Sequence, residues 1–510
     1  MRAVIFCLCS FIAIGAADAN ADCVPGKFAG TAQEARQDPF PILITIICRG
    51  ESVTGQVESA FGVAPISGGV SASTHWRLEG MFDTQQLALE ASQTSDAWTG
   101  AYTLGPSHGS LTLHRDNSAT FAQLGAEAPP QLNLAPAQWQ ADLEALAQEV
   151  PRQHRNAFHS ISRREWESAV SSLQQRLPTL SPTLVPVALR ELVARIGDAH
   201  TSVGLPPAAR LPIGLFWFGG DLRIIETSPE HSDLLGAKIL RIGNRTAQEA
   251  ARLSAQLIVR ENQWSALSAT PYLLRRADVL RYYTLTEDLH SAVLSVRLSN
   301  GSTQDVSLAF VEGGVNDTRY VAGHAPIWRQ QPLDPIWWRP LANGPFYINF
   351  RAYDQLRSHA AELMRVLDER LPAKVILDMR DNGGGDFTVF RDTILRGIQE
   401  RPWLNRRDRL FVIIGREMFS AAMTNAADLR LHTRATLVGE PIGERPNSYQ
   451  EVRFFSLPNS HLRYGVSTQY YEALPGAGNP EAVTPNVYAP PRWRTFARGE
   501  DDALEWIERH

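Results

Sequence analysis

The sequence predicts a multidomain α/β protein, and three observations support this fold class. A chain of 510 residues is too long for one hydrophobic core. Residues 22–125 contain short alternating apolar and polar runs between turn residues, which is typical of antiparallel strands. Beyond residue 342, strand segments alternate with amphipathic helical segments. This alternation indicates parallel crossovers and a sheet covered by helices on both faces.

Composition narrows the class of partner. The chain is 44% hydrophobic and 20% charged, which is ordinary for a folded protein. Its formal net charge of −5 is small, and its only lysines are Lys27, Lys238 and Lys374. We therefore expect neither nucleic acid nor an anionic membrane surface as a partner.

The N-terminus "MRAVIFCLCSFIAIGAADANADC" has the pattern of a secretory signal peptide over residues 1–21. One basic residue precedes an apolar stretch of about fifteen residues, which falls short of the ~20 needed to span a bilayer. Small residues follow at the expected cleavage sites. We expect an exported protein, periplasmic or secreted, without stable membrane insertion.

Cysteine usage fits export. Cys7 and Cys9 lie in the signal peptide, so the mature chain retains Cys23 and Cys48. In an oxidising compartment this pair most simply forms one disulfide near the new N-terminus. A lipoprotein anchor on Cys23 is the alternative, although "NAD" before it lacks the apolar residue such signals use.

The mature chain divides into four regions. We expect an N-terminal β domain over 22–126, a helical domain over 127–205, a smaller α/β domain over 206–315 and the main α/β domain over 316–510. The proline-bearing "EAPPQLNLAP" separates the first two regions.

Three amphipathic helices are predicted in the helical region. The segments "QWQADLEALAQEV", "RREWESAVSSLQQRL" and "PVALRELVARIG" carry apolar residues at positions i, i+3, i+4 and i+7. The last ends at Gly197, a usual C-terminal stop, and leads into "GDAHTSV".

Ser420 stands where a buried strand meets a helix, in "RDRLFVIIGREMFSAAMTNAADLR" (407–430). Such a serine either caps the helix with its hydroxyl or acts as a nucleophile. The carboxyl edge of a parallel sheet is where α/β folds bind ligands. There, the helix N-terminus and the N–H of Ala421 could stabilise an oxyanion.

A second chemical element is the triple-glycine turn in "VILDMRDNGGGDF" (375–387), which follows a buried strand. Glycines let the backbone approach a ligand and direct N–H groups toward it, although a tight strand-to-helix turn would look the same.

A nucleophilic serine needs a base. The histidines after Ser420 are His432, His461 and His510, and His432 falls at the far end of the same helix. His200 in "GDAHTSV" comes from another domain, which is acceptable because catalytic residues assemble in space.

Taken in order, "GDAHT", "ILRIGN", "ILDMRDNGGG", "FSAAMTNAADL", "LVGEPIG" and "VTPNV" resemble the tail-specific protease and tricorn-core family of serine peptidases. The resemblance covers about residues 137–495 and excludes the N-terminal β domain. It implies a crotonase/ClpP-like catalytic domain, and it implies a peptide or protein substrate without a metal or other cofactor. The oligomeric state stays open.

The resemblance also implies roles for single residues. Ser420 matches the nucleophile and Ala421 one oxyanion donor, while Gly384 matches the second donor, with Gly383 and Gly385 adjacent. Asp378 and Arg380 match structural positions in the strand before that turn.

The family uses two kinds of base. One branch uses a lysine downstream of the serine, but this chain has no lysine after Lys374. The corresponding stretch offers Arg445, which cannot lose its proton near neutral pH. The tricorn-like branch uses a histidine in a "GHT"-type motif, which His200 fits.

The acid that orients His200 is less well defined. Glu440 and Glu444 lie in "GEPIGERP", and Glu481 precedes "VTPNV", near the acidic position of the tricorn-like branch. Glu481 is favoured over Glu440. Asp198, two residues before His200, is expected to cap or turn the chain.

The stretch "SPEHSDLLGAKILRIGN" (228–244) resembles a PDZ-like domain, which binds extended peptides by strand addition. Gly236 and Ala237 replace its usual Gly-Asp pair, so a purely structural role stays open. The function expected from all of this is an exported serine peptidase. A non-catalytic binder of peptides or apolar ligands, and a small-molecule esterase, are the alternatives.

Overall fold

The computed structural model describes residues 25–34, 40–49, 52–59, 62–71, 75–82, 85–93, 97–104, 107–116, 130–259, 261–312, 318–332, 334–354 and 356–510. The predicted signal peptide and Cys23 lie outside these residues. Cys48 is disulfide-bonded. By its contacts the chain forms two compact units, one of residues 1–104 and 108–126 and one of residues 105–107 and 127–510.

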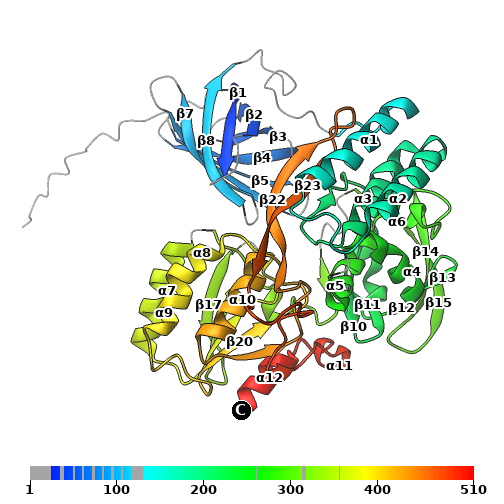
Figure 1. The fold of residues 1–510 in the computed structure, drawn as a ribbon. Coiled ribbons are helices and arrows are strands. Elements are labelled where there is room, and N and C mark those ends of the chain that lie inside the picture. Colours follow the sequence, from blue (N-terminus) through cyan, green and yellow to red (C-terminus); the bar gives the residue numbers. More distant parts are fainter. Residues whose placement is uncertain are drawn as a thin grey trace, which may run out of the picture. The chain divides into compact units, whose positions relative to one another are not determined.

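The first unit is a closed antiparallel barrel of eight strands, as expected for an all-β region (Figure 1). Its first and last strands pair and close it. Alternate residues point inward, and Trp76 and Trp98 stack there with ring centroids 3.9 Å apart. The strands are β1 (Gly26–Glu34), β2 (Phe40–Arg49), β3 (Ser52–Ser59), β4 (Gly62–Ser71), β5 (His75–Phe82), β6 (Gln85–Gln93), β7 (Trp98–Leu104) and β8 (Ser107–Arg115).

The second unit begins with the three predicted helices, α1 (Pro136–Gln153), α2 (Arg163–Arg176) and α3 (Val185–Val193). At the start of α2, Ser162 and Glu165 form a capping box, in which each side chain accepts from the other's backbone N–H. Gly197 ends the helical region with φ +83°, the left-handed conformation predicted for a glycine stop.

An antiparallel sheet follows, with three helices between its strands. Its strands are β10 (Ile213–Phe218), β11 (Asp221–Thr227), β12 (Lys238–Ile242), β13 (Arg245–Thr246), β14 (Ser291–Arg297), β15 (Thr303–Ala309) and β16 (Arg319–Tyr320). Its helices are α4 (Ala247–Ser254), α5 (Gln263–Leu273) and α6 (Ala277–Tyr282).

The main sheet has the order β17-β18-β19-β20-β21-β24 and is parallel from β18 onward, as the strand–helix alternation predicts. The strands are β17 (Ile336–Pro340), β18 (Phe346–Phe350), β19 (Val375–Asp378), β20 (Leu410–Ile414), β21 (Thr436–Gly439) and β24 (Val487–Tyr488). The helices of this region are α7 (Leu356–Arg370), α8 (Phe387–Phe390), α9 (Arg396–Gln399), α10 (Ala421–His432), α11 (Trp493–Phe496) and α12 (Asp502–Arg509).

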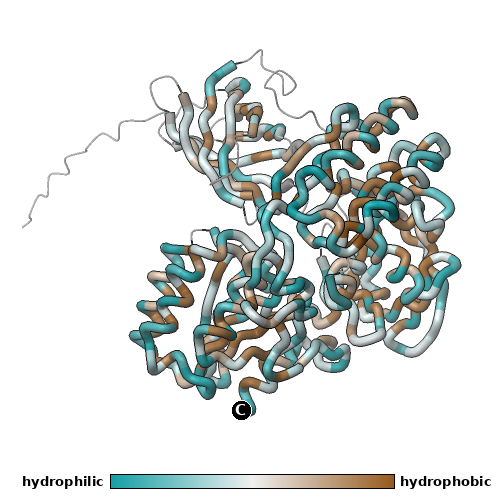
Figure 2. The backbone as a smooth tube through the Cα atoms, in the orientation of Figure 1, coloured by the Kyte–Doolittle hydropathy of each residue, from teal (hydrophilic) through white to brown (hydrophobic). Residues whose placement is uncertain are grey.

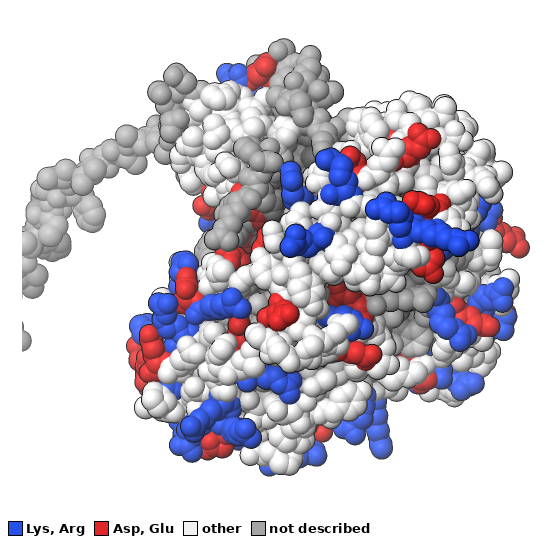
Figure 3. All heavy atoms as spheres, in the orientation of Figure 1, with Lys and Arg blue, Asp and Glu red and all other residues white. Residues whose placement is uncertain are grey.

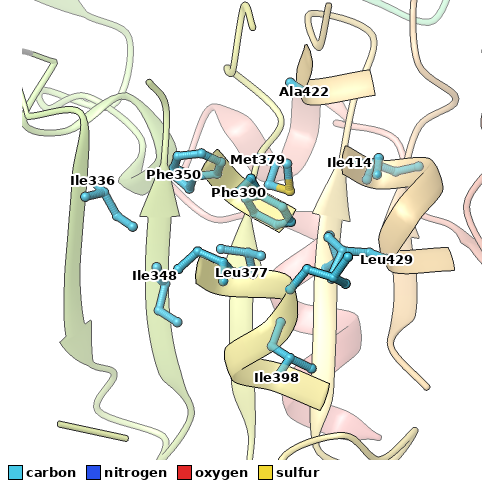
Figure 4. Packing of buried hydrophobic residues seen from close by; sticks show 14 of the residues in the cluster. Ile336, Ile348, Phe350, Leu377, Met379, Phe390, Ile398, Ile414, Ala422 and Leu429 are labelled. Atoms are coloured by element: carbon cyan, nitrogen blue, oxygen red, sulfur yellow. The ribbon is translucent and has the colours of Figure 1, made fainter. Parts of the chain in front are cut away.

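Both faces of this sheet are covered. Ile348, Leu377 and Ile414 pack on one face with Phe390 and residues of α7 and α10 (Figure 4). On the other face, Tyr347 and its neighbours pack against α12. Figure 2 shows the hydrophobic residues gathered along these interior strands.

A three-stranded sheet joins segments of this unit that are far apart in the sequence. The long hairpin of β22 (Asn447–Ser456) and β23 (Arg463–Glu472) pairs through β23 with β9 (Ser202–Val203). This pairing brings the segment after His200 beside the C-terminal half of the chain.

On the visible face, acidic and basic side chains are interspersed (Figure 3). Within the described residues, no helix has the length and apolar character needed to cross a membrane.

Candidate active site

Three chain segments converge at one edge of the main sheet. Strands β20 and β21 are parallel neighbours, so the turns after them, carrying Ser420 and Glu444, leave the sheet at the same edge. The loop carrying His200 arrives through the pairing of β9 with β23, because the β22–β23 hairpin starts directly after the Glu444 segment.

Ser420 is the residue before α10, but it does not cap this helix. Its side chain makes no capping hydrogen bond, and its backbone has φ +55° and ψ −124°. A serine in this strained region between a strand and a helix resembles a nucleophile elbow, which exposes the hydroxyl. The Ser420 N–H donates to Glu444 Oε2.

His200 is buried and faces the same carboxyl group. Its Nδ1 lies 3.6 Å from Glu444 Oε1, and its ring stacks on Phe419 with centroids 4.4 Å apart. No protein group of the described residues hydrogen-bonds to either ring nitrogen. Packing against Phe419 therefore helps to hold the ring, and a backbone group of Tyr449 lies near enough to raise the pKa of His200.

The carboxyl group that lies beside His200 is that of Glu444 and not that of Glu481, the acid favoured from the sequence. The Glu481 side chain is exposed, and its backbone carbonyl accepts from Asn262 Nδ2 at 2.8 Å. Glu440 is also not the partner, because its Oε1 lies 3.6 Å from Arg416 Nη1.

Burial controls the charges of this pair. It lowers the pKa of His200 to about 4, and the opposing charges of Asp198 and Glu451 do not compensate. Burial, together with the charge of Glu261, raises the pKa of Glu444 well above its usual range. His200 is therefore neutral near neutral pH, as a general base must be.

Asp198 turns the chain before His200, as expected. Its Oδ1 accepts from the His200 N–H at 3.0 Å, and its Oδ2 accepts from Thr201 Oγ1. His154 Nε2 lies 3.0 Å from the same carboxylate oxygen. Burial acts to raise the pKa of Asp198, but these hydrogen bonds outweigh it and hold that pKa below its usual value.

The triple-glycine turn lies against Ser420. A Cβ on Gly384 would stand 2.8 Å from Ser420 Cβ and 3.2 Å from Ala421 N. The Gly384 N–H donates to Asn382 Oδ1 at 3.0 Å. In the described part of the chain, the N–H groups of Gly383, Gly385 and Ala421 donate to no protein acceptor.

Asp378 and Arg380 have the structural role expected of them. Arg380 Nη2 lies 2.8 Å from Asp378 Oδ2, and Arg380 Nη1 lies 2.7 Å from Asp501 Oδ2. Tyr347 adds a hydrogen bond to Asp378 at 2.8 Å. The network fixes the end of β19 before the glycine turn.

A cavity of about 540 Å³ adjoins the three residues. Its lining includes Ala199, Phe419 and Gly443, each of which directly precedes one of them. Leu273 and Ile258 contribute apolar wall.

Sequence reasoning named Glu444 as a possible acid but did not select it as the one beside His200. This residue follows Ser420 by 24 positions, in the stretch compared with the family's lysine, so the spacing offered a signal. Glu261 was missed altogether, because a single acidic residue outside any motif carries no pattern in the sequence. Among the residues that the structure describes, no group of His, Cys, Asp and Glu could hold a metal ion.

No protein-family model and no curated protein matches the sequence. Among solved structures, mature CPAF matches with a TM-score of 0.50 and 12% identity, covering 73% of this chain and 96% of that chain. Mature CPAF complexed with lactacystin matches with a TM-score of 0.50 and 13% identity, covering 73% and 98%.

The photosystem II D1 C-terminal processing protease matches with a TM-score of 0.35 and 14% identity, covering 73% of this chain and 96% of that chain. The likeness to CPAF shows that this chain has the same fold, which confirms the multidomain α/β class predicted from its sequence.

Proposed function

We propose that this protein is a serine-type peptidase in which Ser420, His200 and Glu444 carry the reaction. One observation carries the proposal: a single buried carboxyl group contacts both other residues. Glu444 Oε2 accepts the Ser420 N–H, and Glu444 Oε1 lies 3.6 Å from His200 Nδ1. A nucleophile, a base and an orienting acid are the parts that acyl transfer requires.

The reaction follows from these positions. His200 removes the proton of the Ser420 hydroxyl as Ser420 Oγ bonds to the carbonyl carbon of the substrate. The resulting oxyanion accepts from the Ala421 N–H and from an N–H of the triple-glycine turn. Gly384 can serve only after its N–H leaves Asn382, whereas Gly383 and Gly385 are already available.

The intermediate then collapses. His200 gives its proton to the leaving amine, and the C–N bond breaks to leave an acyl ester on Ser420. Water, deprotonated by His200, adds to this ester, and the acid product departs while Ser420 regains its proton. Ser420 and His200 are not hydrogen-bonded in this structure, and such bonds often tighten only when substrate binds.

Three features support a peptide as the substrate. The ordered motifs resemble tail-specific proteases and their histidine-using, tricorn-like branch. The fold is that of CPAF, which has been solved in complex with lactacystin. The cavity beside the site is large enough for a side chain next to the scissile bond. From the same resemblance we propose that residues 206–315 form a PDZ-like domain and that the main sheet belongs to a crotonase/ClpP-like domain. From the signal-peptide pattern of residues 1–21 we propose that the protein is exported.

Labelling with a fluorophosphonate probe tests the proposal, because the probe reacts only with an activated serine. We expect the wild type to be labelled, and Ser420→Ala and His200→Ala to lose the label. His432→Ala is the matched control, since His432 lies exposed at the other end of α10 and should leave labelling unchanged.

Labelled wild type would next be given peptide libraries and small esters, which separate a peptidase from an esterase. A folded wild type that takes no label would overturn the proposal in favour of a non-catalytic binder on the same fold.

A further inference from the structure

The site contains a second buried carboxyl group with no part in the reaction described above. Glu261 is 3% exposed and lies just before α5, in the region between the helical domain and the main sheet. A buried carboxyl group is costly unless hydrogen bonds satisfy it, so its partners define what it does.

The partners of Glu261 are the neighbours of two proposed catalytic residues. Its Oε1 accepts from the Ala199 N–H at 2.9 Å, one residue before His200. Its Oε2 accepts from the Arg445 N–H at 2.8 Å, one residue after Glu444. The two oxygens of one carboxyl group thus hold the two segments whose side chains face each other.

The backbone around Glu261 strengthens this link. Arg445 Nε donates to the Glu261 carbonyl at 2.6 Å. The Nδ2 of Asn262, the next residue, donates to the Ile442 carbonyl at 3.0 Å. Asn262 also begins α5, because its Oδ1 accepts from the Ser265 N–H at 2.9 Å. The segment that holds the site is therefore anchored to a helix of the smaller sheet domain.

We infer that Glu261 is a positioning residue, which holds the His200 and Glu444 segments together and places its carboxyl group beside the Glu444 segment. The inference rests on the proposed function for its catalytic meaning. Glu261 contacts no reacting atom, so it acts through the two residues that it aligns. In this it differs from Ser420, His200 and Glu444, which carry the proposed reaction.

The charges around Glu261 explain how it would tune the site. Asp198, Glu444 and Arg445 are the charged and titratable groups that interact with Glu261. Burial raises the pKa of Glu261 to about 7, and the charge of Asp198 adds to this rise. In turn, the charge of Glu261 raises the pKa of Glu444. Removing that charge lets Glu444 ionise at lower pH.

Glu261→Gln is the first test, because glutamine keeps the shape but loses the charge and one acceptor. We expect the labelling rate at neutral pH to fall about 10-fold, the loss expected for one charge-assisted hydrogen bond. We also expect the acid limb of the labelling rate to move to lower pH. A merely structural role would lower the rate equally at every pH.

Asp142→Asn is the matched control. Asp142 is 0% exposed, and its carboxyl group accepts from the backbone N–H groups of Asn459 and Ser460, each at 2.8 Å, at the tip of the β22–β23 hairpin. This variant loses the same kind of hydrogen bond away from Glu444. It should lose stability and keep the acid limb of the wild type.

Glu261→Asp tests the effect of the carboxyl group's position apart from that of its charge. It also provides a test if the glutamine variant does not fold. Aspartate keeps the charge but is one methylene too short to reach both N–H groups. Its labelling rate should fall while its acid limb stays at the wild-type pH. A wild-type rate and acid limb in both Glu261 variants would overturn the inference.

Hydrogen exchange tests the same contacts without catalysis. In Glu261→Gln, amides in peptides covering 198–203 and 442–448 should exchange faster than in the wild type, and those around 459–460 should not. Equal exchange in both proteins would overturn the inference even if the wild type took no label. Failure of labelling with altered exchange would instead overturn the proposed function alone.

Discussion

The charges of His200 and Glu444 show how burial shapes the proposed site at the scale of single residues. Their side chains are 3.6 Å apart, yet burial moves the pKa of His200 down and that of Glu444 up. Both shifts favour a neutral pair over an ion pair, because desolvation outweighs their attraction. The proton that matters for activity is therefore the one on Glu444.

The acid limb of kcat/KM should accordingly reflect Glu444. His200 is already neutral above about pH 4, whereas Glu444 keeps its proton to a higher pH than an ordinary carboxyl group. Activity should rise with pH as Glu444 ionises and can stabilise the His200 imidazolium. A pH–rate profile measures this, and an acid limb near pH 4 would contradict it.

Substitution of Glu444 should have a large effect. Glu444→Gln should lower kcat/KM by about 100-fold or more, because the imidazolium loses its acid partner. Glu481→Gln, measured beside it, addresses the sequence-based assignment. If kcat/KM falls in the Glu481 variant and not in the Glu444 variant, Glu481 is the acid that orients His200.

Burial of neutral His200 also predicts how stability depends on pH. The folded pKa is about 4 and the unfolded value 6.5, so the unfolded state binds more protons between these values. Stability is therefore lost as pH falls from 6.5 to 4, by at most about 3 kcal/mol. Urea unfolding of the wild type and His200→Gln should show a difference in free energy that changes across this window and is constant above it.

At the scale of elements, two turns meet at the proposed nucleophile. Ser420 has φ +55°, and Gly384 has φ +109° and approaches Ser420 Cβ too closely to carry a side chain. The turn after β19 and the turn after β20 are thus fitted to each other, since their strands are parallel neighbours.

Gly384→Ala should therefore abolish most activity. The added Cβ would strain the backbone and push Ser420 or Ala421 from position, so labelling should fall by about 100-fold, as for loss of an oxyanion donor. Gly344→Ala is a suitable control, because Gly344 also has positive φ but a Cβ there meets nothing within 4 Å. Equal labelling of the two variants would contradict this account.

The elements were largely predictable from the sequence, but one contact in the site was not. Periodicity predicted the helices around Trp139 and Trp166, and strand–helix alternation predicted the parallel sheet, because both patterns are local. Motif order led to Ser420 and His200. The pairing of His200 with Glu444 depends on the β9–β23 register, which no local pattern encodes.

At the scale of the whole molecule, the barrel has its own core. Trp76, Phe28 and Trp98 pack inside it, and Trp76 is 2% exposed. Among the residues that the structure describes, its strands pair only with each other. A unit with its own core can unfold separately from the rest of the chain.

Trp76→Ala tests this independence. It should destabilise the barrel by about 3–5 kcal/mol, the usual cost of truncating a buried tryptophan. Calorimetry should show two unfolding transitions, of which only the one that belongs to the barrel moves to lower temperature. Fluorophosphonate labelling should be lost at the other, unchanged transition. A single transition that moves as a whole would contradict the prediction.

The pairing of β9 with β23 also has a consequence for how the protein is made. Ser202, next to the segment of His200, pairs with Gly465 of β23. His200 is therefore synthesised more than 260 residues before the strand that holds its segment in place. A chain emerging N-terminus first therefore cannot complete the three-residue site until the β22–β23 hairpin has been synthesised. Nascent chains shorter than this remain without a formed site throughout translation.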